Sequence, residues 1–118
     1  MEMSDRDGIG VAALNNEDFR NPNLLEDVFQ GLMQDLRRGR LVVDLSKVES
    51  IMSLGVAVLV AAQGLALIHN TKIAFAGMQK GVRKILRLTG ADQAISIHDS
   101  VDAAVLSLRA SSRRKAMH

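Results

Sequence analysis

The sequence predicts an α/β domain built around a mixed, mostly parallel sheet of four to five strands with about four helices. Short apolar runs that suit buried strands alternate with longer stretches in which apolar residues recur at helical spacing. The resulting order, β-α-β-α-β-α-β-α, is typical of parallel strands joined by right-handed crossovers. A length of 118 residues fits one domain, which we expect over residues 8–110, with flexible termini at 1–7 and 111–118.

The first half of the chain begins with a strand over residues 8–14 (GIGVAAL). An Asn- and Asp-rich loop follows at 15–23 and holds Pro22, so Asn21 or Asn23 can cap the next helix. That helix is amphipathic and ends before Gly39, which stops it. Its buried face is formed by Leu24, Leu25, Val28, Phe29, Leu32, Met33 and Leu36.

The second half begins with a buried strand at 41–45, followed by a helix over 54–68 that is apolar on almost every side and is therefore largely buried. Ser53 lies where the loop meets this helix, and its hydroxyl can cap the first turn. We then expect a strand at 73–76, a helix at 79–89 ended by Gly90, a strand at 94–98, and a last helix at 101–108 capped by Ser100.

Composition narrows the possible partners. Aromatic residues make up 3% of the chain, without Trp or Tyr, which disfavours nucleic-acid modules that stack bases on aromatic side chains. The net charge is +2, and Arg113, Arg114 and Lys115 of the tail supply much of it. The apolar stretch 54–68 is shorter than the roughly 20 residues that span a bilayer, and the acidic start is unlike a signal peptide. With no Cys as well, we expect a soluble, cytoplasmic protein without nucleic-acid binding or membrane insertion.

No catalytic or metal-binding constellation is apparent. His69, His98 and His118 are scattered, without ligands at metal-site spacing, and no phosphate-binding loop or nucleophile elbow is present. Gly8, Gly10 and Ala13 have the spacing of a dinucleotide-binding turn but begin a strand instead of following one. Asp44 can be read as a carboxylate at a strand end or as a turn residue that bonds backbone amides. We therefore expect no enzyme activity, no cofactor and no metal.

Ser53 is open to two interpretations. As a helix cap it would contribute about 1 kcal/mol to stability. The same position also suits phosphorylation, because phosphate oxygens there would meet free backbone amides and the positive end of the helix dipole.

Residues 42–59, V-V-D-L-S-K-V-E-S-I-M-S-L-G-V-A-V-L, resemble the signature of the STAS domain as found in anti-sigma factor antagonists. The resemblance continues at Ala76-Gly77, at 82–90 and in the last helix, and so covers about residues 8–108. It implies a partner-switching regulator. The unphosphorylated domain would sequester an anti-sigma factor that is also a serine kinase of the histidine-kinase-like ATPase type. Phosphorylation would release it, and a metal-dependent, PP2C-type phosphatase would reset the switch.

Carried over by position, the resemblance assigns the phosphoacceptor to Ser53 and a close-approach glycine to Gly55. Two positions depart from the family pattern: Met52 replaces an aspartate and Leu54 replaces a second serine. These departures favour an alternative, a non-switching accessory or structural STAS subunit of a stress-sensing scaffold or a lipid-transport complex.

By analogy with the family fold, the expected partner surface comprises the loop before the central helix, the start of that helix and the neighbouring loop. Its residues are Glu49, Ser50, Met52, Ser53, Leu54, Gly55, Val56, Asp18, Asn21 and Asn23. A basic stripe on the helix at 79–89, formed by Lys80, Arg83, Lys84 and Arg87, is either a solvated face or a further docking contact. A small nucleotide-binding enzyme, the third reading, lacks a phosphate cradle.

Overall fold

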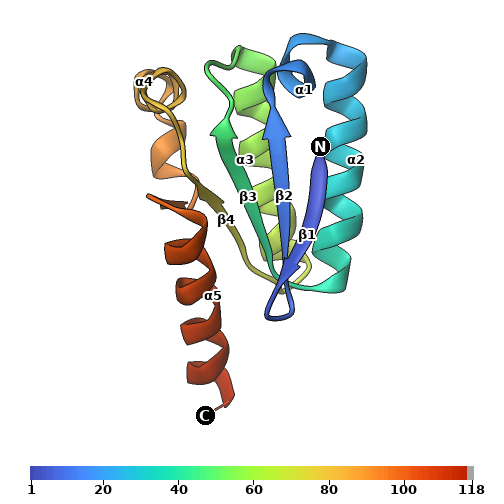
Figure 1. Cartoon of the computed structure of the whole chain (residues 1–118), viewed down its shortest axis with the longest axis vertical. Coiled ribbons are helices and arrows are strands. Elements are labelled where there is room, and N and C mark those ends of the chain that lie inside the picture. The colour runs from blue at the N-terminus through green and yellow to red at the C-terminus, as the bar shows by residue number, and fades with distance from the viewer. Residues whose placement is uncertain (117–118) are drawn as a thin grey trace.

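The structure, a computed structural model, describes residues 1–116 and the side chains of residues 1–110. It consists of one five-stranded sheet with helices on both faces (Figure 1). In chain order the elements are β1 (Glu2–Arg6), β2 (Ile9–Asn15), α1 (Asn16–Arg20), α2 (Pro22–Arg38), β3 (Leu41–Lys47), α3 (Ser53–Ile68), β4 (Ile73–Ala76), α4 (Lys80–Thr89), the 3-10 turn η1 (Ala91–Gln93), β5 (Ile97–His98) and α5 (Val101–Ala116). The predicted α/β class with a mixed, mostly parallel sheet is confirmed.

The strands lie in the sheet in the order β1-β2-β3-β4-β5, with β1 antiparallel to β2 and all other neighbours parallel. When parallel strands follow one another in order, right-handed crossovers place every connecting helix on the same face. The buried side chains of α2, α3 and α4 accordingly share one large core cluster on that face. Helix α5 comes after the last strand and packs on the opposite face, against β3, β4 and β5.

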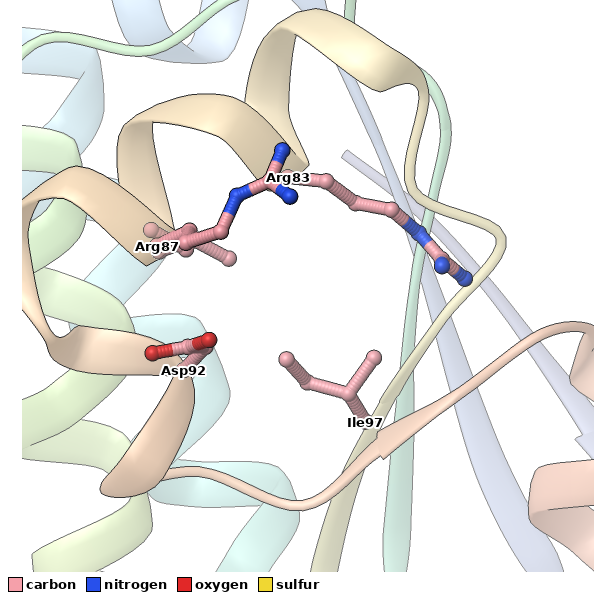
Figure 2. Close-up of a pocket in the computed structure, with 5 residues that line it drawn as sticks. Arg83, Arg87, Asp92 and Ile97 are labelled. Carbon is pink, nitrogen blue, oxygen red and sulfur yellow. The ribbon is translucent and has the colours of Figure 1, made fainter.

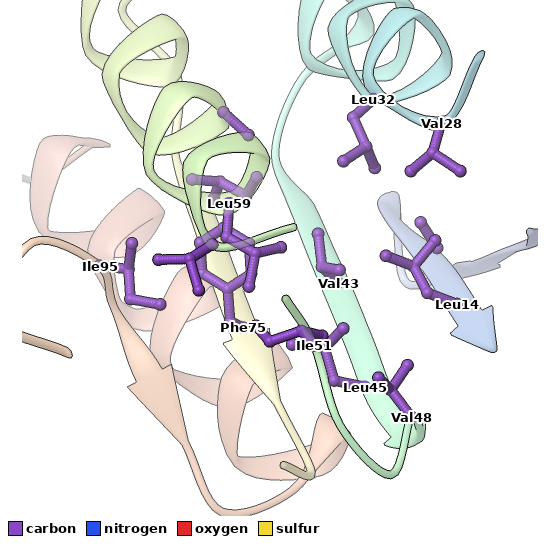
Figure 3. Close-up of a cluster of buried hydrophobic side chains, with 14 of the residues drawn as sticks. Leu14, Val28, Leu32, Val43, Leu45, Val48, Ile51, Leu59, Phe75 and Ile95 are labelled. Carbon is purple, nitrogen blue, oxygen red and sulfur yellow. The ribbon is translucent and has the colours of Figure 1, made fainter. Parts of the chain in front are cut away.

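The two faces of the sheet are packed differently. Phe75 on β4 is fully buried at the centre of the larger cluster, with Leu59 of α3 and Val43 of β3 beside it (Figure 3). On the opposite face, β4 presents Ala74 and Ala76 to α5. Because both faces are covered, the central strands are continuous apolar runs and not alternating ones, as the sequence predicted for 41–45 and 73–76.

The N-terminus differs from the expectation for residues 1–7. We expected these residues to be frayed, but Glu2–Arg6 pairs with β2 over five residues. All five side chains are exposed, so the strand has no apolar pattern that the sequence could reveal. The hairpin turn is Asp7-Gly8, and both residues have positive φ angles, 56° and 84°. Such angles are required by the hairpin turns that suit the twist of paired strands.

The other differences concern the ends of elements. Residues 111–116, expected in a flexible tail, continue α5, and Met117 and His118 lie outside the described residues. The expected loop at 15–23 contains the short helix α1, whose N-terminus is capped by reciprocal bonds between Asn15 and Asp18. The strand expected at 94–98 is reduced to Ile97–His98, because Ala94 still has helical backbone angles as the chain leaves η1.

Candidate functional site

The start of α3 has a different cap from the one we predicted. Met52 is the N-cap residue, with extended backbone angles, and no side chain caps the helix; Ser53 is the first helical residue. The prediction that Ser53 caps α3 is therefore wrong, because the chain enters helical geometry one residue earlier than a serine cap requires. The asparagine prediction is confirmed for α2, where the Asn21 side chain accepts a 3.0 Å bond from the Asn23 amide and Pro22 follows at the first helical position.

The first turn of α3 presents free backbone donors. Its first helical hydrogen bond runs from the Val56 amide to the Met52 carbonyl at 3.1 Å, so the amides of the three residues between them have no acceptor inside the helix. These amides are the positive end of the helix dipole. Ser53 is exposed at this end, with Met52 (74% exposed) and Leu54 (54% exposed) on either side. A hydroxyl that belongs to this turn is therefore accessible to a visiting protein.

Gly55 lets α3 approach α1 closely. A Cβ atom at this position would lie 2.8 Å from Cδ1 and 3.2 Å from Cε1 of Phe19, and 3.3 Å from Cβ of Ile51. These distances are below ordinary van der Waals contact, so a side chain here would push the buried Phe19 ring away. The close approach that the family resemblance assigned to Gly55 is thus present, and its neighbour is the ring of Phe19.

An apolar groove of about 520 Å³ opens beside Ser53, where the start of α2, the start of α3 and the end of α4 converge. Arg20 is the one charged residue among those that line it. The lining residues are Phe19, Arg20, Pro22, Leu25, Ile51, Met52, Ser53, Leu54, Gly55, Ile85 and Thr89. This end of the molecule therefore offers a mostly apolar surface with a positive charge and a free hydroxyl.

Most of the predicted surface residues lie exposed at this end of the molecule, whereas Gly55 and Val56 are buried beneath it. The loop that holds Glu49 and Ser50 adjoins α1, because the Glu49 amide donates to Asn16 Oδ1 at 2.8 Å. Phe19, Arg20, Ile85 and Thr89 also line the groove but were not predicted. Phe19 and Arg20 fell in a supposed loop, and the α4 residues come from a helix distant in sequence.

Asp18 does not belong to the accessible surface that we expected. Its residue is 7% exposed, and its oxygens accept bonds from the Asn15 amide at 3.0 Å and from the Met1 amino group at 3.2 Å. Asn15 in turn accepts from the Asp18 amide at 3.1 Å. Asp18 therefore caps the start of α1 and, through the Met1 amino group, holds the start of β1 beside it. We leave Asp18 out of the surface proposed below.

The basic stripe of α4 borders a smaller hollow on another side of that helix. Figure 2 shows Arg83 and Arg87 extending from α4, with Asp92 and Ile97 across from them. The Arg83 guanidinium is bonded to Asp99 Oδ1 at 2.8 Å. All four basic residues of the stripe, Lys80, Arg83, Lys84 and Arg87, are exposed, as both readings of the stripe require.

Two other sequence candidates have structural roles. The Asp44 carboxylate accepts a 3.0 Å bond from the Ser46 amide, which confirms the predicted bond to a backbone amide. The strand does not end there, however, because β3 continues to Lys47. Gly8 lies in the β1–β2 turn and is followed by strand β2. A dinucleotide-binding turn is instead followed by a helix, so these glycines do not form one.

The described residues hold no group of three or more His, Asp or Glu side chains positioned to bind a metal ion. None of the helices in the described part of the chain has the length and apolar character needed to cross a membrane.

Comparison with known proteins identifies the family. The family model "Mlab, STAS domain" matches residues 18–108. The chain is a STAS domain protein. A search of curated proteins found no match to it.

Solved structures agree with this assignment. An anti-sigma factor antagonist from Mycobacterium paratuberculosis is 25% identical, with a TM-score of 0.72 and 92% of each chain covered. The anti-sigma factor antagonist SpoIIAA in its unphosphorylated form is 11% identical, with a TM-score of 0.74, covering 92% of this chain and 96% of that one. A component of the stressosome is 18% identical, with a TM-score of 0.76, covering 95% and 99%. The last two show that the STAS domain has the same fold as these proteins.

Proposed function

We propose that this STAS domain is a protein-binding module of the anti-sigma factor antagonist type, not an enzyme, and that Ser53 is its phosphorylation switch. The observation that carries the proposal is the exposed Ser53 hydroxyl at the positive start of α3, on the rim of an apolar groove. The unmodified surface would bind an anti-sigma factor that is also a serine kinase of the histidine-kinase-like ATPase type. A PP2C-type phosphatase would remove the phosphate. The protein would act in the cytoplasm, without a cofactor, nucleic acid or membrane insertion.

The proposed binding surface consists of the exposed residues around this serine. They are Glu49, Ser50, Met52, Ser53, Leu54, Asn21 and Asn23, with Gly55 and Val56 shaping the turn beneath them. Apolar side chains that become buried at the centre of an interface contribute most to affinity, and Met52 and Leu54 are exposed apolar residues on either side of Ser53.

A phosphate on Ser53 would change this surface in two ways. The free amides of the first turn and the dipole would stabilise about two added negative charges, so the modified state would be well ordered. The same charges would sit between Met52 and Leu54, where a partner that covers these side chains would have to strip water from the phosphate. The partner would therefore be released.

The experiment compares Ser53→Asp with Ser53→Ala in binding to the cognate kinase, by calorimetry or surface plasmon resonance. We expect Ser53→Asp to weaken binding at least about tenfold, and Ser53→Ala to retain it. Ser107→Asp on α5 is the matched control, because Ser107 is exposed at a different place on the molecule. Incubation with kinase and ATP, followed by mass spectrometry, should label Ser53 in the natural sequence and leave Ser53→Ala unlabelled. A complex unaffected by Ser53→Asp would contradict the switch.

A second function is favoured by one observation, the apolar pair Met52 and Leu54 at the positions where the family carries an aspartate and a serine. An apolar rim suits a permanent complex, so the chain can instead be a non-switching accessory subunit of a stress-sensing scaffold or a lipid-transport complex. In that case Met52→Asp would abolish assembly, while the natural protein isolated from cells would carry no phosphate. A phosphorylated Ser53 in that material would contradict this alternative.

A further inference from the structure

Helix α3 has an apolar face that points away from the core. Its 16 residues include no charged side chain, and its buried side is formed by residues such as Gly55, Leu59 and Ala66. Rotation by about 100° per residue places Leu54 and Ala61 on the opposite side of the helix. A helix that is apolar on every side is normally buried all round. This one is covered on one side only.

The uncovered side is a continuous apolar strip. From one end of α3 to the other it is formed by the exposed Leu54, Ala57, Ala61 and Ile68, of which Ile68 is 77% exposed, and by Leu65 at its edge, which is half-buried against the core. Helix α2 lies beside α3 over the same face of the sheet (Figure 1), so the exposed sides of both helices look away from it. Large contiguous apolar patches on a protein surface usually mark a binding site.

We infer that this face binds a second copy of the chain, with the two α3 helices antiparallel and related by a two-fold axis at Ala61. About that axis, Leu54 of one copy lies opposite Ile68 of the second copy, and Ala57 lies opposite Leu65. Large side chains therefore meet small ones along the middle of the contact, and the two Ala61 residues cross at its centre. An isologous contact needs such self-complementarity.

The antiparallel orientation follows from the sizes of these side chains. A parallel pair would place Leu54 against Leu54 and Ile68 against Ile68. It would leave a gap along two turns, where Ala57 faces Ala57 and Ala61 faces Ala61. Close-packed interfaces do not retain such gaps. Helix–helix contact at Ala61 brings the two backbones near, because alanine at the crossing point leaves little side chain between them.

The charges of α2 support a second copy as the occupant. Glu26 and Asp27 are exposed near the start of α2, and Arg37 and Arg38 are exposed at its end. The two-fold axis that makes the α3 helices antiparallel also makes the flanking α2 helices antiparallel. The acidic start of one α2 then lies toward the basic end of the other, while the centre of the interface carries no charge. Complementary charges at the rim fix orientation more than they add affinity.

Sedimentation velocity on the full chain tests the contact, with no other protein present because Leu54 also belongs to the surface proposed for a partner. We expect the natural sequence to approach twice its 12.8 kDa mass as concentration rises. Ala61→Glu should weaken the dimer at least about 100-fold, because two carboxylates would meet at the axis. Ala110→Glu is the matched control, since Ala110 is an exposed alanine on α5. Circular dichroism shows whether both variants are folded.

A cysteine variant gives an independent measurement, because the chain has no cysteine of its own. Oxidised Ala61→Cys should form a disulfide-linked dimer, since facing residues at a close helix crossing come within the reach of a disulfide, and Ala110→Cys should remain monomeric. A natural chain that stays monomeric at every concentration would overturn the inference and would indicate that a different protein covers the apolar face of α3. A dimer that survives Ala61→Glu, or that Ala110→Cys crosslinks equally well, would also overturn it.

Discussion

The contact between Gly55 and Phe19 leads to a prediction whose sign depends on tertiary structure. In an isolated helix, Gly→Ala stabilises by up to about 1 kcal/mol. At Gly55 the added Cβ would lie 2.8 Å from a ring carbon of Phe19, and an ordinary contact begins at 3.4 Å. The ring is buried in the main core cluster, so it must move by about 0.6 Å against its neighbours.

Overpacking of this kind costs about 1–3 kcal/mol, which outweighs the gain in helix propensity. We therefore expect Gly55→Ala to lower the free energy of unfolding by about 1–2 kcal/mol and the Tm by about 3–10 °C. Urea unfolding followed by circular dichroism measures the first quantity, and calorimetry the second.

The same substitution at Gly64, in the same helix, is the control. No atom lies within 4 Å of a Cβ at Gly64, so Gly64→Ala should stabilise the chain by about 0.5–1 kcal/mol. Both variants are measured at low protein concentration to exclude self-association. Phe19→Leu should remove most of the penalty of Gly55→Ala in a double-mutant cycle. If Gly55→Ala proved as stabilising as Gly64→Ala, the packing argument would be refuted.

Three further outcomes follow from the structure. Asn21→Ala should lower the free energy of unfolding by about 1 kcal/mol, because Asn21 caps α2, whereas Ser53→Ala should change it by less than about 0.5 kcal/mol. Equal losses of the two variants in urea unfolding would show that Ser53 does cap α3. Gly81→Ala should destabilise by about 1–3 kcal/mol, since its Cβ would clash with the Glu49 carbonyl oxygen, and a Tm equal to that of the natural chain would refute this contact. Burial raises the pKa of Asp35 above 3.8, so the folded state binds its proton more tightly than the unfolded chain, and this group lowers stability as pH rises through that pKa. Asp35→Asn should therefore be more stable than the natural chain at pH 7 and lose that advantage below pH 3.8, and an advantage present only in acid would contradict the sign.

The elements that the sequence predicted well are those whose burial repeats along the chain. The runs at 41–45 and 73–76 are covered on both faces, so every position is apolar except Asp44, which is half-buried. The face of α2 that repeats at three- and four-residue spacing is the buried one, at Leu25, Val28 and Leu32. In contrast, β1 is held by backbone pairing and exposes every side chain, so periodicity missed it. The Asp7-Gly8 pair was a local signal for its hairpin that we did not use.

The candidate site likewise has one part that the sequence predicted and one part that it did not. The motif located Ser53 at the start of the central helix, and the structure exposes it there. The cap was wrong because the exact residue at which a chain turns into a helix depends on how the preceding loop packs. Phe19, Ile85 and Thr89 could not be assigned, since they reach the groove from elements separated in sequence from Ser53.

The sequence by itself determined the α/β class, the order of the parallel strands along the chain and the apolar character of α3, because each depends on residue type repeated over a local stretch. Tertiary structure alone decided which side of α3 is left open, which ring Gly55 must accommodate and that Asp18 is buried. These depend on distances between segments far apart along the chain, and such distances are fixed only when the helices pack on the sheet.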